Sequence, residues 1–403
     1  MKRLFRMIKQ HLSFFTSKSQ HFSESEYINQ DSILLECIVE KGIIDYLSFD
    51  YSTQKRRTLE YLDSLHLGNN TSYEYRYTLN GTLSNIYNSV YACMLLSLYG
   101  EIENKSESYK KKWVAYFDSF QDAESGLFFD PTIRNESYDD SDWWGARHLI
   151  PQIINAYSAL GSMPQYEFRW VSMYYDKQNL HKIINSCDWN SAIPDEIDID
   201  NKLMNIGVTL QYQRDFWQDR LAKESIAYLK ELLLKRINPE TGLWGKYDKN
   251  DSHELPRMIQ FSYHLFRIFF YDHETIPNAE KIIDIILLSQ NKYGGFGEKL
   301  NSSACEDIDA IDTLIYLSKQ TDYRNNDINN AVRRGLIFIL SNQNEDGGFV
   351  FRRDEPLWYG HETMSSKKNE SALFPTWFRT LSLAYICNFI GIGEYNIIKC
   401  PGY

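Results

Sequence analysis

The chain has 403 residues, of which 43% are apolar and 15% aromatic, which is ample for a large core and excludes a disordered protein. Its net charge of -11 argues against a nucleic-acid partner, because nucleic-acid phosphates would be repelled. Six scattered cysteines without a CxxC pair are typical of free thiols in a reducing compartment. The composition therefore predicts a folded cytoplasmic protein of two ordinary domains or one closed repeat architecture.

The N-terminal residues 1–15 place four basic side chains among apolar ones. Read as a helix, this segment is amphipathic and could touch an anionic membrane surface at the periphery, whereas the simpler alternative is a helix docked on the protein body. No long apolar stretch follows the charges, so we expect neither a signal peptide nor a membrane-spanning helix. We divide the chain into an N-terminal segment, residues 1–54, and a single domain, residues 55–403.

Apolar helical patterns follow one another along the rest of the chain, and we see no strand-like alternation of any length. In chain order they cover residues 88–99, 108–120, 143–160, 178–195, 205–216, 222–236, 256–270, 278–290, 307–318, 327–343 and 371–390. This is roughly six helix pairs. The sequence therefore predicts an all-α fold.

Short Gly-aromatic marks separate these helices at a regular interval. The distance from Gly242 to Gly295 is 53 residues, the distance from Gly295 to Gly348 is again 53, and Gly126 lies about two periods upstream of Gly242. A repeat of this length cannot bury its apolar face alone, so neighbouring units must stack. Six stacked pairs predict an α/α toroid with an inner and an outer ring of helices, and an open solenoid is the alternative. We expect each Gly to end a helix in the left-handed conformation.

In a toroid the inner helices run parallel, so the residues before each inner helix gather at one mouth. These positions are rich in aromatic, cationic and imidazole side chains, which makes them candidates for substrate binding: Trp143, Trp144, Arg147, His148, His253, Arg257, Trp377 and Arg379. The ordinary alternative is that the charged residues cap helices and that the tryptophans belong to the core.

The segment 304–313 carries the strongest sign of chemistry. Cys305, Asp309, Asp312 and Tyr316 recur at intervals of three or four residues and therefore share one helical face. Two acids close together on one face of an inner helix raise the pKa of one of the pair, and a carboxyl that stays protonated near neutral pH can act as a general acid.

The stretches 290–298 and 343–349 resemble the Gln…Gly-aromatic repeat of squalene–hopene cyclases, related class II terpene cyclases and protein prenyltransferase β subunits. These families are α/α toroids. Class II cyclases protonate their substrate with the middle Asp of an Asp-x-Asp-Asp motif, and here Asp307-Ile308-Asp309-Ala310 stands at that place with Ala as its last residue. The resemblance implies that Asp309 is the catalytic acid, supported by Asp307 and Asp312.

The same resemblance implies further roles. Aromatic rings such as those of Trp143, Trp144, Tyr263 and Trp377 would stabilise carbocations, and Arg147, Arg257 or Arg379 would hold a diphosphate or another anion at the mouth. Prenyltransferases bind zinc through Asp-x-Cys and a later His. Here the order is inverted, Cys305-x-Asp307 with His361 downstream, so we expect no metal and no cofactor.

Two functions from different classes fit these residues. The first is acid-initiated cyclisation of an isoprenoid, which needs a deep and mostly apolar cavity. The second is the binding or conversion of a glycan, which needs polar groups and a carboxylate pair beside aromatic platforms. A non-catalytic scaffold is the third interpretation.

Overall fold

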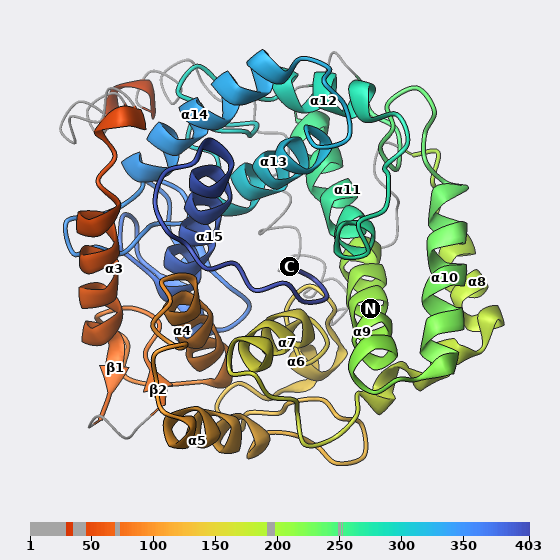
Figure 1. Cartoon of the computed structure of the whole chain (residues 1–403), viewed down its shortest axis with the longest axis horizontal. Helices are drawn as coiled ribbons and strands as arrows, with labels where there is room; N and C mark the ends of the chain where they lie inside the picture. The colour runs from red at the N-terminus through yellow and green to blue at the C-terminus, as the bar shows by residue number, and fades with distance from the viewer. Residues whose placement is uncertain (1–29, 35–45, 69–72, 192–197, 249–250, 252) are drawn as a thin grey trace, which may run out of the picture.

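The structure is a computed structural model that describes residues 30–34, 46–68, 73–191, 198–248, 251 and 253–403 (Figure 1). The amphipathic helix predicted for residues 1–15 lies outside these ranges. The regular secondary structure of the described residues is helical apart from two antiparallel pairs of two-residue strands, β1 (His66–Leu67) with β2 (Glu74–Tyr75) and β3 (Leu357–Trp358) with β4 (Ser365–Ser366). None of the described helices is long and apolar enough to cross a bilayer.

Six helices form an inner ring. Each packs against the next, and the last packs against the first, so the ring is closed (Figure 1). The helices of the inner ring are α4 (Ile86–Leu98), α7 (Leu149–Ala159), α9 (Ile199–Phe216), α11 (Glu254–Tyr271), α13 (Ala304–Leu317) and α15 (Leu373–Ile390). The predicted α/α toroid is therefore confirmed, and contact between α15 and α4 excludes the open solenoid.

A second set of helices lies outside this ring, one before each inner helix in the chain (Figure 1). These outer helices are α3 (Tyr51–Leu65), α5 (Glu107–Asp118), α8 (Lys177–Asn185), α10 (Arg220–Leu234), α12 (Ala279–Leu288) and α14 (Asn325–Ser341). The two sets differ in burial. Helix α4 is buried at nearly every position, whereas α10 buries mainly one stripe that includes Ala222, Ile226, Leu229 and Leu233. An outer helix needs only one apolar face, because its other face meets solvent.

The Gly-aromatic marks form tight turns between an outer and an inner helix. The aromatic residue of each mark pairs with a residue just after the outer helix, as in the bridges from Gln290 to Phe296 and from Gln343 to Phe349. Phe296 and Phe349 are almost fully buried. Each mark thus fastens its turn to the core.

The glycines sit differently from our prediction. Helices α12 and α14 end at Leu288 and Ser341, several residues before the glycines, so these glycines do not cap the helices. Left-handed backbone occurs at the first Gly of each Gly-Gly pair, with φ of +101° at Gly294 and +91° at Gly347, but not at Gly295 or Gly348. The reason is that the chain reverses within the turn itself, where a β-bridge forms.

The glutamine before each turn links neighbouring units. Gln290 Nε2 donates to Gly294 O at 2.9 Å and to Ala331 O, on α14, at 2.8 Å. Gln343 Nε2 donates in the same way to Gly347 O at 2.9 Å and to Thr58 Oγ1, on α3, at 3.1 Å. The second pair joins the last unit to the first, so the repeat residues also close the ring.

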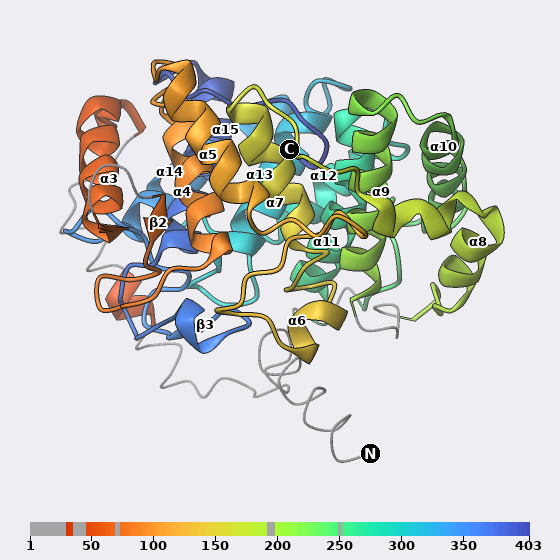
Figure 2. The same cartoon turned by 90° about the horizontal axis from the view of Figure 1, so that it is seen from below.

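Inner helices run parallel because an antiparallel outer helix separates each from the next. Their N-terminal ends lie at the end of the ring where α6 (Glu136–Asp140) and β3 are seen in Figure 2. Residues 391–403 cross the opposite end. Asn396 N donates to Leu98 O at 2.9 Å, at the C-terminal end of α4, and the segment then turns into the middle of the ring (Figure 1).

Candidate active site

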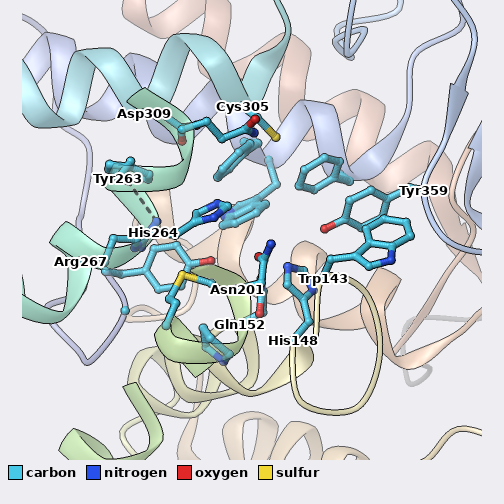
Figure 3. Close-up of a pocket in the computed structure, with 18 residues that line it drawn as sticks. Trp143, His148, Gln152, Asn201, Tyr263, His264, Arg267, Cys305, Asp309 and Tyr359 are labelled. Atoms are coloured by element: carbon cyan, nitrogen blue, oxygen red, sulfur yellow. Dashed lines mark hydrogen bonds between the residues drawn. The ribbon is translucent and has the colours of Figure 1, made fainter. Parts of the chain in front are cut away.

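A cavity lies inside the inner ring and measures about 670 Å³, counting the space that is open to solvent. Its walls come from α7, α9, α11, α13 and α15, from the segments around them and from the C-terminal residues (Figure 3). The lining residues are Trp143, His148, Pro151, Gln152, Asn201, Met204, Gln260, Tyr263, His264, Arg267, Cys305, Asp309, Tyr359, Phe374, Trp377, Phe378, Gly402 and Tyr403.

Tyr403 and Gly402 close the inner end of the cavity. The Tyr403 ring lies 5.9 Å from the Trp377 ring, centre to centre, and the Arg267 guanidinium stands 4.2 Å above its face. Gly402 lies against Pro151 and Val208. The central space is therefore a pocket with a floor.

One wall is aromatic. Tyr359 stacks on Phe374 with ring centres 4.1 Å apart, and Trp377 stacks on Phe378 at 4.9 Å. Trp143 also lines the cavity (Figure 3). Of the predicted binding residues, Trp143 and Trp377 are thus placed on this surface.

The other wall is polar. Gln152, Asn201 and Gln260 bring amides to the cavity. His264 accompanies them, and its Nδ1 lies 2.7 Å from Asp200 Oδ2. A histidine held by a carboxylate at one ring nitrogen is oriented so that the other nitrogen can exchange a proton.

Asp309 lies on the cavity side of α13, one turn after Cys305 (Figure 3). It is 1% exposed, and its Oδ2 has no hydrogen-bond partner among the described residues. Burial raises the pKa of Asp309 well above the usual range, and nearby acids raise it further, while Arg267 opposes the shift. These surroundings favour the neutral, protonated form of the Asp309 carboxyl.

Asp312 lies one turn further along α13. Its Oδ2 accepts a hydrogen bond of 2.9 Å from Tyr263 Oη, which in turn accepts one of 3.1 Å from Arg267 Nη1. Burial raises the pKa of Asp312 as well. Tyr263 itself lines the cavity, so Asp312 acts on the site through that phenol rather than directly.

Asp307 and Arg379 point away from the cavity and toward each other. Arg379 Nη1 donates to Asp307 Oδ2 at 2.9 Å, and both side chains are buried. Asp307 Oδ1 also accepts from Phe296 N and Ser302 Oγ. Both carboxylate oxygens of Asp307 are therefore engaged in contacts that hold the turn before α13. Neither Asp307 nor Arg379 lines the cavity.

Of the remaining predicted substrate-binding residues before α7, one lines the cavity and two do not. Trp144 is 2% exposed and stacks on Tyr87, and Arg147 Nε pairs with Asp142 at 2.8 Å, so neither lines the cavity. His148 does line it. Burial, together with the nearby His264, lowers the pKa of His148 to about 3, which keeps its imidazole neutral.

The candidates at the start of α11 also lie apart from the cavity lining. His253 Nδ1 pairs with Glu298, and Arg257 is exposed in the first turns of α11. Among the described residues, no group of three His, Cys, Asp or Glu side chains could hold a metal ion.

Several lining residues escaped the sequence analysis, chiefly Gln152, Asn201, His264, Arg267 and Tyr403. Gln260, His264 and Arg267 follow the three- and four-residue spacing around Tyr263 on α11, so the helical-face argument applied to α13 would have found them. Nothing in the sequence pattern pointed to Tyr403, because only the path of the C-terminal segment brings it into the ring.

No protein-family model matches the chain, and no curated protein matches it. Solved structures that resemble it include a GH76 α-mannanase from Bacteroides thetaiotaomicron, with a TM-score of 0.48, 12% identity, and coverage of 85% of this chain and 97% of that chain. A type II terpene cyclase, MstE from Scytonema, in complex with geranylgeranyl dihydroxybenzoate, matches with a TM-score of 0.48, 11% identity, and coverage of 84% and 98%. A polysaccharide lyase matches with a TM-score of 0.43, 11% identity, and coverage of 89% and 98%. At this identity the resemblance extends to the fold and assigns no reaction to the chain.

Proposed function

We propose that the protein binds a carbohydrate in its central cavity and acts on it with Asp309 as proton donor. The observation that carries the proposal is the buried Asp309 carboxyl, whose Oδ2 has no partner within the described chain and which lines a cavity of mixed polar and aromatic character. This reading replaces isoprenoid cyclisation as the first choice, because an isoprenoid needs a mostly apolar cavity.

The polar wall suits a sugar. Each sugar hydroxyl both donates and accepts hydrogen bonds, and the amides of Gln152, Asn201 and Gln260 offer both kinds of group. The aromatic wall offers flat apolar surfaces against which the C–H faces of a pyranose can pack. A few polar groups set among aromatic rings are the usual composition of a small-molecule site.

The acid and base needed for glycoside hydrolysis are both available. Asp309 would donate its proton to the glycosidic oxygen as the bond to the anomeric carbon breaks. His264, oriented by Asp200, would take the proton of the attacking water. The Asp309 carboxylate then regains a proton from solvent, and the protonated His264 releases its proton to solvent, which restores both groups.

The floor formed by Tyr403 bears on the length of the ligand. Because the pocket ends there, a polysaccharide could not thread through the ring. The proposed substrate is therefore a chain end or a short oligosaccharide, which enters from the side of the inner-helix N-termini.

The aromatic wall supports a second candidate, acid-initiated cyclisation of an isoprenoid. In that reaction Asp309 would protonate a double bond, and the faces of Trp377, Phe378 and Tyr359 would stabilise the resulting cation. Both candidate functions use Asp309 as the acid. They differ in the substrate and in whether His264 is needed as a base.

The test is turnover by purified protein of a panel of neutral and acidic oligosaccharides, and of squalene and polyprenyl diphosphates. Asp309→Asn preserves shape but cannot donate an acidic proton, and Asp63→Asn, exposed on α3, is the matched control. Oligosaccharide cleavage that is lost in Asp309→Asn but kept in Asp63→Asn supports the proposal. Turnover of an isoprenoid alone supports the second candidate, and sugar turnover that survives in Asp309→Asn removes the assigned acid.

A further inference from the structure

A second buried polar atom at the cavity, besides Asp309 Oδ2, also lacks a hydrogen-bond partner among the described residues. Arg267, on α11, is 7% exposed, and its Nη2 has no hydrogen-bond partner in the described chain. Among the described residues its side chain makes one hydrogen bond, from Nη1 to Tyr263 Oη, and it forms no salt bridge. Burying a cation without a counterion lowers the stability of the folded protein, so we looked for a ligand group that Arg267 could bind.

The geometry leaves one edge of this guanidinium free. The guanidinium carbon lies over the Tyr403 ring, 4.2 Å from its centre, and over the Tyr263 ring, 5.2 Å from its centre. The bond to Tyr263 Oη uses Nη1. The edge formed by Nε and Nη2 remains, and it is this pair of parallel N–H groups that binds a carboxylate through two hydrogen bonds.

Another arginine of this protein binds a carboxylate through its Nε and Nη2 groups. Arg214 donates from Nε to Asp215 Oδ1 at 2.7 Å and from Nη2 to Asp215 Oδ2 at 2.7 Å. Arg379, which is even more buried than Arg267, has Asp307 as its counterion. In contrast, the acids nearest to Arg267 on α13, Asp309 and Asp312, both lie where burial favours their neutral form.

We propose that Arg267 binds a carboxylate of the ligand through Nε and Nη2, so that the substrate is an acidic sugar of the uronate class. This inference rests on the proposed function, since it names the substrate class of that site. Among the described residues that line the cavity, Arg267 is the only Arg or Lys. One guanidinium edge matches the single charge and planar shape of a carboxylate, whereas phosphates usually meet several cations or a helix N-terminus.

The experiment measures binding by isothermal titration to the full chain and to three variants. The probes are a β-1,4-linked mannuronate tetrasaccharide and the β-1,4-linked mannotetraose, which differ mainly in the carboxylates. Arg267→Met removes the charge at similar length, Arg267→Lys keeps the charge but not the planar edge, and Arg220→Gln is a surface control on α10.

We expect the full chain to bind mannuronate at least tenfold more tightly than mannotetraose. Arg267→Met should abolish that preference, Arg267→Lys should restore only part of it, and Arg220→Gln should retain it. The melting temperature of ligand-free Arg267→Met should equal or exceed that of the full chain, because an unpaired buried charge is removed. A structural arginine would instead lower the melting temperature.

Failure of this inference can be told from failure of the proposed function. Equal binding of the two sugars that does not depend on Arg267 overturns the inference and leaves the carbohydrate site standing. A lower melting temperature of Arg267→Met with loss of binding to both sugars also overturns it. Geranylgeranoic acid is the third probe: Arg267-dependent binding of this acid, without binding of either sugar, supports the carboxylate contact and overturns the carbohydrate function.

Discussion

Arg379 Nη1 donates a hydrogen bond of 2.9 Å to Asp307 Oδ2, and the two side chains are 0% and 1% exposed. The pair joins α15 to α13, and Arg379 also donates to Val350 O and Phe351 O in the turn that follows α14. It therefore connects two successive repeats. Asp307 lies only two residues before Asp309 in the sequence motif, yet the two carboxyls have different roles. Asp307 pairs with Arg379 in the interior, whereas Asp309 faces the cavity.

Breaking this pair should cost much stability. Arg379→Met leaves Asp307 buried without its counterion, and we expect the free energy of unfolding to fall by about 3–5 kcal/mol. The measurement is urea denaturation followed by circular dichroism. As a control, Arg324→Met removes the half-exposed partner of Asp284 and should cost about 1 kcal/mol or less. A loss of the same small size in both variants would contradict a structural role for the buried pair.

Asp309→Asn should stabilise the protein at neutral pH. The folded state raises the pKa of Asp309, so between its unfolded value near 4 and its folded value the native state holds more protons than the unfolded state. Its contribution to stability is then complete at low pH and declines as pH rises, by about 1.4 kcal/mol per unit across that window. When melting temperatures are measured between pH 4 and pH 8, the excess of the Asp309→Asn melting temperature over that of the wild type should grow as the pH rises. A gap that is constant over this range would rule out a proton held on Asp309.

His148 should give the opposite slope. Burial lowers the pKa of His148 to about 3, so between pH 3 and pH 6.5 the unfolded state binds a proton that the native state does not. Stability therefore falls as pH drops through 6.5, by about 1.4 kcal/mol per unit. His148→Gln should remove this part of the dependence between pH 6.5 and pH 5, as followed by urea midpoints. An unchanged slope in the variant would show that the native imidazole accepts a proton in this range.

The turn glycines offer a test of the repeat. Gly347 has φ of +91°, and a Cβ there would stand 2.1 Å from Arg57 O, on α3, whereas Gly391 has φ of +74° with no atom within 4 Å of a Cβ. Gly391→Ala should cost about 1 kcal/mol through backbone strain alone. Gly347→Ala should cost about 1–3 kcal/mol more, because the two units must separate. Equal urea midpoints for the two variants would mean that the contact between the last and first units adds little.

Much of the fold could be predicted because the repeat is local information. The 53-residue spacing of Gly242, Gly295 and Gly348, with helical periodicity between them, is enough to indicate stacked helix pairs, and stacking of about six pairs leads to a closed ring. The same periodicity placed Cys305 and Asp309 on one face of α13, and both line the cavity.

The site depended on information that no local pattern contains. The Asp307 carboxyl is taken by Arg379, 72 residues away in the chain, and this pairing withdraws both residues from the cavity. The floor comes from Tyr403, and the Asp200–His264 pair spans 64 residues. Helical spacing shows which residues share a face but not which distant residues meet them.

The sequence by itself thus determined the architecture, since Gly-aromatic turns and apolar helix faces act within one unit and between adjacent units. It also singled out the helix that bears the buried acid. The tertiary structure decided which carboxyl faces the ligand and which ties the repeats together, because burial and partners, not residue type, set the charge and role of each. It also brought Arg267 to the cavity without a counterion, and that unpaired charge is what points to an acidic sugar.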